Sequence, residues 1–328
     1  MTFKRALYAA AGSLFLAGAA MAQPVTIASN PPGTDSNTVS AGIANYLSGQ
    51  GMQAVVRPYA GTGVYGPLIT TPEVSMGLLT GADAFMQYSG ADDREPLTTL
   101  RALFRAFPLP YGYFVRCNSE ITNISGLAGK RVAVDIQANA SLGPINRAIL
   151  ASSGLGEDDL EFVTVGNLPS GIQGVVDGNL DAMSVAAGIA RMQEANATTP
   201  GGICYLELDG ENATQAELEK SVFGLTTYTI EPGPVFPEIT DPVKIASLDF
   251  FMTADASMSD DQAYAVVKAM HENWAALQED YPTLRKAPLD GLASATNGVP
   301  FHPGAIKYFE EVGLWSEDNA TRDAGLME

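Results

Sequence analysis

The amino-acid sequence predicts an α/β protein built of two lobes. Strand-like apolar runs alternate with helical stretches along most of the chain, which is typical of largely parallel sheets covered by helices. A chain of 328 residues is longer than one hydrophobic core usually organises, so two units are expected. We therefore expect crossings from the first lobe to the second near residue 113 and back near residue 225. Lobe I would comprise 23–113 and 226–328, and lobe II would comprise 114–225.

The elements of the first lobe begin with a strand at VTIAS (25–29). A helix over 36–50 follows, because apolar residues recur there at a spacing of four, and Asp35 or Ser36 would cap it. A second strand is predicted at QAVVRPY (53–59).

The second lobe is predicted to start after PLPYGY (108–113), where proline and glycine break the pattern. Its strands would be RVAVDI (131–136), EFVTV (161–165) and DAMSVA (181–186). A helix is expected over 142–152, with its apolar residues on one face.

The return to lobe I is predicted at a proline-rich stretch, TTYTIEPGPVFPEITDP (226–242). A long helix then runs from Ser259 to about Glu279. Ser259 would cap this helix, and the acidic residues directly after it favour the positive end of the helix dipole.

The N-terminus has the pattern of a cleaved secretory signal. Lys4 and Arg5 precede an apolar run, which ends at the small-residue site Ala20-Met21-Ala22. The run is shorter than the roughly 20 residues that span a bilayer. We expect cleavage after Ala22 and a mature protein in the periplasm.

The charge excludes two classes of partner. The chain has 18 basic and 37 acidic residues, a net charge of −19, and loss of Lys4 and Arg5 with the signal leaves −21. Such a surface repels nucleic acid and anionic membranes.

Cysteine and histidine are scarce. Cys117 and Cys204 lie in strand-like segments of an exported chain, so a disulfide and two separately buried thiols are both open interpretations. With only two histidines, His271 and His302, the usual zinc and non-haem iron sites are not expected, nor is a cofactor. His302 is expected to hold the C-terminal helix in place.

Gly61, Gly63 and Gly66 form a literal G-x-G-x-x-G. A dinucleotide fingerprint also needs an acidic residue about 20 positions on, at the end of a strand, and none is found there. Export from the cytoplasm also disfavours nicotinamide chemistry. The glycines instead indicate a loop whose backbone N–H groups approach an anion closely.

Three loops of this kind follow predicted strands: NPPGTDSN (30–37), AGTGVYG (60–66) and QANAS (137–141). In open α/β sheets ligands bind at the carboxyl ends of strands, where helix starts expose free N–H groups. The sequence therefore predicts a ligand cleft between the lobes, lined by these loops.

Several stretches resemble the TAXI solute receptors of tripartite ATP-independent periplasmic (TRAP) transporters, over nearly all of the mature chain. They are GLAGKRVAVDIQANASLGPINRAILASSGL (126–155), GIQGVVDGNLDAM (171–183), IEPGPVFPEITDPVKIASL (230–248) and PFHPGAIKYFEEVGLW (300–315). The last is similar to the family's Leu-His-Pro-Gly-Ala box.

The resemblance implies a type II periplasmic binding protein whose two lobes close over a small solute and deliver it to a membrane-embedded TRAP permease. Receptors of this family bind small organic acids and acidic amino acids, including glutamate and 2-oxoglutarate. The first loop lacks the family's Gly-Gly-x-Tyr-Tyr pattern, and the glycine-serine segments of the other two loops are replaced by Gly61-Thr62-Gly63 and Asn139-Ala140-Ser141. The solute itself is therefore not carried over.

The candidate ligand-binding residues combine backbone N–H, hydroxyl and amide groups. For Thr34, Asn37, Thr80 and Asp83 a helix-capping role is an equal alternative. No arginine is assigned to the ligand. The full set is Thr34, Asn37, Gly61, Thr62, Gly63, Val64, Tyr65, Thr80, Asp83, Asn139, Ala140 and Ser141.

A receptor without chemistry and without catalytic residues, acting as a monomer, is the leading hypothesis. The alternatives are a periplasmic partner of a membrane sensor and a lyase or dehydratase on the same two-lobed fold. Against an enzyme, the sequence contains no G-x-S-x-G and no metal-ligand cluster.

Overall fold

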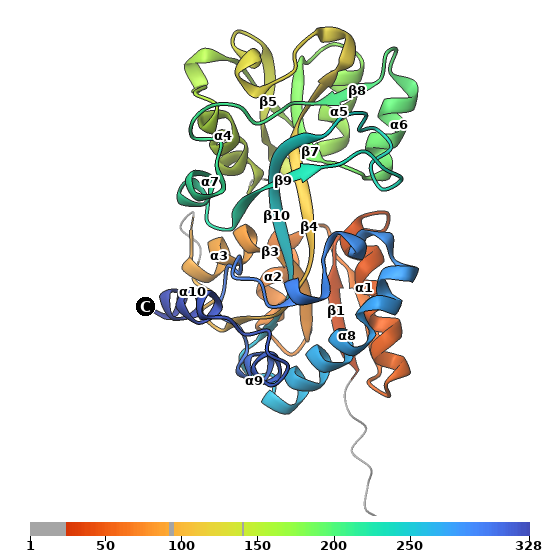
Figure 1. Cartoon of the computed structure of the whole chain (residues 1–328), viewed down its shortest axis with the longest axis vertical. Coiled ribbons are helices and arrows are strands. Elements are labelled where there is room, and N and C mark those ends of the chain that lie inside the picture. The colour runs from red at the N-terminus through yellow and green to blue at the C-terminus, as the bar shows by residue number, and fades with distance from the viewer. Residues whose placement is uncertain (1–23, 92–94, 140) are drawn as a thin grey trace, which may run out of the picture.

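The computed structural model describes residues 24–91, 95–139 and 141–328. The predicted signal peptide (1–22) and Ala140 lie outside them. Strands in this part of the chain form one sheet that runs through two lobes, stacked vertically in Figure 1. The strands are β1 (Val25–Ser29), β2 (Ala54–Pro58), β3 (Met76–Thr80), β4 (Leu100–Arg116), β5 (Arg131–Ile136), β6 (Glu161–Val165), β7 (Ala182–Ala186), β8 (Ile203–Tyr205), β9 (Leu225–Ile230) and β10 (Val243–Asp255).

Helices flank the sheet on both sides in each lobe (Figure 1). The helices are α1 (Asp35–Gly49), α2 (Thr62–Ile69), α3 (Gly81–Ser89), α4 (Leu142–Ser152), α5 (Leu168–Val176), α6 (Ala190–Thr198), α7 (Gln215–Ser221), α8 (Asp260–Asp280), α9 (Pro303–Glu311) and α10 (Glu317–Met327). Two short 3-10 helices also matter below: η3 (Gln137–Asn139) and η5 (Pro282–Lys286).

The strand order is repeated in the two lobes. The sheet reads β2-β1-β3-β10-β4-β7-β5-β6. In lobe I three parallel strands are followed by antiparallel β10, and in lobe II three parallel strands are followed by antiparallel β4. The two-lobed α/β fold predicted from the sequence is confirmed.

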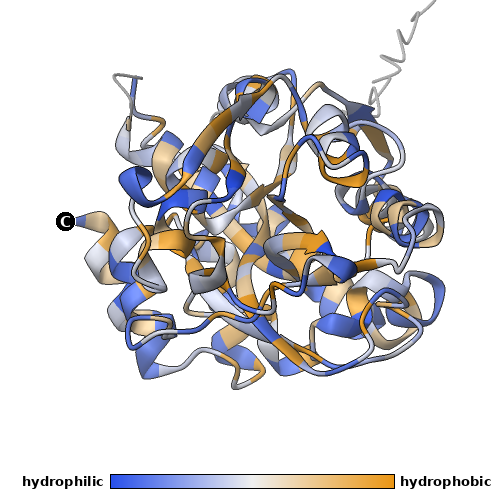
Figure 2. Ribbon diagram, turned by 90° about the horizontal axis from the view of Figure 1, so that it is seen from above, coloured by the Kyte–Doolittle hydropathy of each residue, from blue (hydrophilic) through white to orange (hydrophobic). Residues whose placement is uncertain are grey.

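The hydrophobic core is divided between the lobes. One cluster fills lobe I and joins β1, β3, α1, α8 and α9, with Trp274 fully buried in it. Lobe II has one cluster on each face of its sheet: Val132 and Val134 point to the α4 side, and Ala133 points to the α5 side. This alternation is the period of a strand buried on both faces. Hydrophobic segments, in orange, lie on the strands at the centre of Figure 2 as well as on the surrounding helices.

β4 passes from lobe I into lobe II without a break, so the predicted interruption at 108–113 is wrong. Pro108 and Pro110 lie inside the strand, opposite Asp249 and Ser247 of β10. On its other side β4 pairs with β7 only from Tyr111 onward. The Pro110 carbonyl faces that side, where it accepts from Ala187 N. The nitrogen of a strand residue points to the same side as its carbonyl, so the two proline nitrogens face away from β10 and remove no hydrogen bond to it.

β9 belongs with lobe II, because Leu225 and Ile230 pack in the two lobe II clusters. The chain then returns to lobe I along β10, whose N-terminal half pairs with β9 and whose C-terminal half pairs with β3. The bounds 23–113, 114–225 and 226–328 stay predictions. We propose that the second boundary lies within β10 rather than at 226.

A disulfide joins Cys117 to Cys204, with an S–S distance of 2.05 Å. It links the residue after β4 to the short strand β8 at the end of lobe II that is remote from lobe I. Of the two interpretations left open by the sequence, the structure shows the disulfide.

His302 caps α9, which is the structural role expected from the sequence. Its Nδ1 accepts from Gly304 N at 3.2 Å and its Nε2 lies 2.9 Å from the Met258 carbonyl oxygen. A carbonyl only accepts, so Nε2 carries the proton and the ring is neutral. Burial lowers the pKa of His302, although the Met258 carbonyl and Asp260 oppose the shift.

We expect the free energy of unfolding to fall as the pH is lowered from 7.5 to 5.5. The pKa of His302 is lower in the folded chain than in the unfolded one, so the unfolded state takes up the proton first and acid favours it. His271 has a lowered pKa and acts with the same sign. Urea denaturation at four pH values measures the slope. In His302→Asn, which keeps a capping oxygen, only the contribution of His271 should remain, and an unchanged slope would contradict this assignment.

Candidate functional site

The carboxyl ends of two strand triplets face each other at the middle of the molecule. β3 is antiparallel to β10, β7 is antiparallel to β4, and β4 and β10 are antiparallel to each other. The triplets β1–β3 and β5–β7 therefore point toward one another from the two lobes (Figure 1). We call the loops after these six strands, with the middle of β4 and β10 (108–110 and 247–249), the interlobe junction.

Helices α1 to α6 each begin shortly after one of these strands. Their N-termini carry unpaired N–H groups and the positive end of the helix dipole. The junction is therefore approached from both lobes by groups that favour an anion.

The first predicted loop places Thr34 at the N-cap of α1. Its hydroxyl accepts from Asn37 N at 3.2 Å and donates to the Pro31 carbonyl at 2.9 Å. The Asn37 amide donates to the Ser29 hydroxyl at the end of β1. Both side chains thus support the loop in this state.

The second predicted loop leads into α2, with Gly61 at its N-cap and no side chain capping it. Thr62 is half-buried, whereas Gly63 and Val64 are exposed, with 51% of Val64 accessible. Tyr65 does not lie at a surface: it is fully buried in the lobe I core, and its hydroxyl donates to the Leu78 carbonyl.

Gly66, the last glycine of this loop, packs against α3. A Cβ there would lie 1.8 Å from Gln87 Oε1. The glycine therefore permits close contact between two helices, which accounts for it without a nucleotide. β3, the strand that follows, ends in Thr80 and not in an acidic residue.

Thr80 and Asp83 sit at the start of α3. The Thr80 hydroxyl caps the helix by accepting from Asp83 N and lies 3.0 Å from Asp83 Oδ2. Thr80 is buried and Asp83 is half-buried. The capping role of Thr80, weighed above, is present in this structure.

In lobe II, Asn139 ends η3 and Ser141 stands at the N-cap of α4, where its side chain makes no capping hydrogen bond. The third residue predicted there, Ala140, lies outside the described residues. Asn139 and Ser141 are both half-buried. The three predicted loops follow β1, β2 and β5, while contact of their residues with a ligand stays a prediction.

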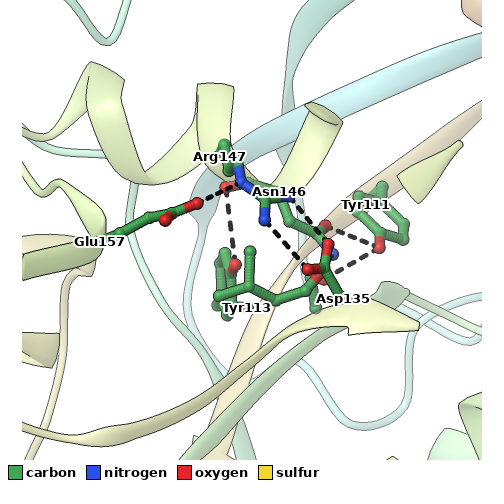
Figure 3. A network of polar contacts seen from close by, with 8 residues as sticks. Tyr111, Tyr113, Asp135, Asn146, Arg147 and Glu157 are labelled. Carbon is green, nitrogen blue, oxygen red and sulfur yellow. Dashed lines mark hydrogen bonds and ion pairs between the residues drawn. The ribbon is translucent and has the colours of Figure 1, made fainter. Parts of the chain in front are cut away.

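A buried polar network lies beneath this loop, at the contact of α4 with β4 and β7 (Figure 3). The Asn146 side-chain oxygen Oδ1 lies 2.9 Å from the Tyr111 hydroxyl and 2.6 Å from the Ser184 hydroxyl. These hydroxyls are themselves 2.9 Å apart, and the Asn146 amide donates to the Val134 carbonyl at 2.7 Å. Three contacts share two hydroxyl protons, so at most two of them are hydrogen bonds at once.

Two arginines close in sequence to the predicted loops already have carboxylate partners. Arg147 contacts Asp135 through both terminal nitrogens and Glu157 through Nε (Figure 3), and it holds the pKa of Asp135 below its usual range. Arg57 is exposed, 3.9 Å from Glu73.

Charged side chains that border the junction were not assigned to the ligand from the sequence. Arg105 of β4 pairs with Asp249 of β10 at 2.7 Å, and Asp249 also accepts from Thr296 at 2.6 Å. Lys286, the last residue of η5, lies 3.8 Å from Asp35 at the start of α1. Lys286 is in a stretch, PTLRKAP, with the appearance of an exposed turn, so no local signal marks it.

The lobes touch on both sides of the shared strands. On one side the Lys286 ammonium lies 4.8 Å from the centre of the Phe236 ring. On the other side Phe85 of α3 stacks on Phe223 with ring centres 4.1 Å apart, and Arg322 of α10 covers that ring. Gly224, with φ of +79°, packs its backbone on the start of α3, where a side chain would collide.

Among the described residues, no group of three or more His, Cys, Asp or Glu side chains is arranged to hold a metal ion. None of the helices in this part of the chain is long and apolar enough to cross a membrane.

A family model described as the NMT1-like family matches residues 27–313. Solved structures similar to this chain include a TctC solute binding protein from Polaromonas, 14% identical, with a TM-score of 0.49 over 92% of this chain and 96% of that one. The periplasmic aliphatic sulphonate binding protein SsuA from Escherichia coli is 14% identical, with a TM-score of 0.47 over 91% of each chain. The amino acid transporter substrate-binding protein AbpA from Streptococcus pneumoniae, bound to L-arginine, is 12% identical, with a TM-score of 0.47 over 80% and 95%.

Proposed function

The chain belongs to the NMT1-like family, and we propose that it is a solute-binding receptor, which captures a small molecule at the interlobe junction without transforming it. The observation that carries the proposal is the arrangement of six helix N-termini, three from each lobe, around the middle of β4 and β10. A ligand held there would contact both lobes, so binding would favour their closed arrangement.

The ligand class that fits this junction is a small organic acid or an acidic amino acid. Free backbone N–H groups at helix starts bind carboxylates well. The hydroxyl and amide groups of the loops at 30–37, 60–66 and 137–141 supply further donors. The sequence resemblance to TAXI receptors supports the same class and a TRAP permease as the membrane partner.

The same resemblance and the predicted signal peptide support a periplasmic, monomeric receptor, with lobe II moving against lobe I. The hinge would be the middle of β4 and β10, where two prolines and a buried ion pair lie between the lobe cores. No catalytic residue is part of this proposal.

A ligand of this class should raise the melting temperature. At a concentration of 100 times its Kd, a ligand that binds only the folded state adds about 2.7 kcal/mol, which corresponds to roughly 4 to 8 °C for a chain of this size. Native mass spectrometry of protein purified without refolding, followed by mild denaturation, identifies a copurified ligand. Small organic acids and amino acids are then added to the protein one at a time, and the shift of the melting temperature is measured for each.

A diamine of similar length, at the same concentration, serves as the control and should give no shift. The proposal is overturned if no acid or amino acid raises the melting temperature and none copurifies. Turnover of an added acid would instead identify an enzyme.

A further inference from the structure

Lys286 is a buried cation at the boundary between the lobes. Only 4% of its side chain is exposed, compared with 15% for Arg105 and 16% for Arg322, the other shielded cations in ion pairs. It comes from η5 of lobe I, which packs against β4, α1 and α8. Its ammonium therefore lies where the start of α1 meets lobe II.

This ammonium makes no short hydrogen bond to the described residues, and its contact with Asp35 is long. An ammonium has three donors, and a buried one is costly unless they are satisfied. Among the described residues none accepts a hydrogen bond from Lys286, because Asp35 Oδ2 is 3.8 Å away. Burial lowers the pKa of Lys286, although Asp35 and Glu238 oppose the shift.

Lobe II closes the other side of the ammonium. The Phe236 ring lies 4.8 Å from Nζ and packs on Gly188, in the turn after β7, where a side chain would be 2.9 Å from the ring. In the same turn Gly188 N donates to Glu238 Oε1 at 2.5 Å, while the buried Glu238 Oε2 has no hydrogen-bond partner among the residues that the structure describes. The ammonium thus stands between the strand ends of β1 and β7.

The other shielded cations have short ion pairs, although Arg105 Nε and one terminal nitrogen of Arg322 have no hydrogen-bond partner among the described residues. Arg105 has Asp249 at 2.7 Å. Arg322 pairs with Glu219, donates to the Asn297 carbonyl at 3.0 Å and stacks on Phe223. Lys286 differs because its one carboxylate partner, Asp35, is distant and 23% exposed, so it can turn toward solvent.

We propose that Lys286 is the residue that anchors a carboxylate group of the ligand, in the place that Asp35 partly fills when no ligand is bound. The inference rests on the proposed receptor function and names the cation of that site. The carboxylate would accept from Lys286 Nζ and lie at the start of α1, whose dipole favours a negative charge. Because the ligand carboxylate would replace the Asp35 carboxylate, the negative charge close to Glu238 would not increase when the ligand binds.

The test is isothermal titration of succinate, 2-oxoglutarate and L-glutamate into the wild type and Lys286→Met, a nearly isosteric change that removes the charge. We expect the Kd of whichever acid binds to rise about 10- to 100-fold, the effect of losing a charged hydrogen bond. Lys307→Met is the matched control: this lysine also faces a ring, Tyr264 at 5.3 Å, but lies on α9. Its Kd should equal that of the wild type.

Asp35→Asn gives an effect of opposite sign and keeps the test valid even if Lys286→Met does not fold. Removal of the competing carboxylate should tighten binding about two- to fivefold. If Lys286 only held the lobes together, Asp35→Asn would not tighten binding, and Lys286→Met would enlarge the ligand-free molecule in small-angle X-ray scattering.

Three results overturn the anchor alone. The first is an unchanged Kd in Lys286→Met, and the second is a higher Kd in Lys286→Met together with an enlarged ligand-free molecule. The third is an unchanged or higher Kd in Asp35→Asn. If the wild type binds none of the acids and copurifies with none, the proposed ligand class and the anchor fall together. A neutral or cationic copurified ligand overturns the anchor while the receptor function stands.

Discussion

Replacement of Cys117 and Cys204 together by serine should lower the free energy of unfolding by about 4 to 5 kcal/mol. The disulfide closes a loop between residues 87 positions apart. In the chain-entropy model, a cross-link over so long a loop removes much of the freedom of the unfolded chain. Both positions are half-buried, so serine is tolerated there. Urea denaturation of the wild type and the variant at one pH measures the difference.

The single variant Cys204→Ser is the control for this experiment. It lacks the same cross-link and should lose the same stability, so a difference between the two would come from the side chains and not from the loop. A loss below about 1 kcal/mol in both variants would contradict the entropic account.

The Asn146→Ala variant should be less stable than the wild type by about 3 kcal/mol. Asn146 is fully buried, and its loss leaves the Val134 carbonyl without the amide donor and the two hydroxyls without their shared acceptor. Each buried group left unsatisfied costs about 1 to 3 kcal/mol. The Tyr111 and Ser184 hydroxyls can still bond each other, which limits the loss.

The matched control is Asn273→Ala on α8. That asparagine is half-buried and its amide donates to the Ala269 carbonyl of its own helix. Alanine is the better helix former there, so the change should be within about 0.5 kcal/mol of zero. Equal destabilisation of the two variants would show that the network in Figure 3 contributes nothing of its own. The midpoint of urea unfolding, with an unchanged slope, reports the difference.

The elements with a strong local signal were predicted closely. The helix expected over 142–152 is α4 (Leu142–Ser152), and Ser259 caps α8 by accepting from Gln262 N. Each of these depends on residues within one or two turns of the element. The strand expected at 161–165 also has the predicted bounds.

The path of the chain between the lobes was predicted less well, because proline is judged from the sequence without knowledge of which strand edge it faces. Pro108 and Pro110 are tolerated inside β4 because their nitrogens face away from β10, toward the side that β7 pairs only from Tyr111 onward. The position of that edge follows from where β7 ends, at Ala186, about 75 residues further along the chain. A local pattern contains no information on it.

In the candidate site, too, the features that depend on nearby residues were predicted and those that depend on distant residues were not. The three loops were found because strand ends and helix starts are local features. Lys286 was not found, because its burial results from Asp35, far away in the sequence, and from Phe236 of the other lobe. Tyr65 was expected beside the ligand but is in the core, since α2 turns its ring toward β3.

The late position of the shared strand β10 in the sequence also determines when lobe I can fold during synthesis. Phe251 on β10, Trp274 on α8 and Phe309 on α9 belong to the lobe I core. They lie in about the last quarter of the chain, although the lobe begins at its N-terminus. A ribosome-bound chain that lacks this quarter cannot bury the apolar faces of β1, β3 and α1, so lobe I must stay unfolded, and open to chaperones, until translation has nearly ended.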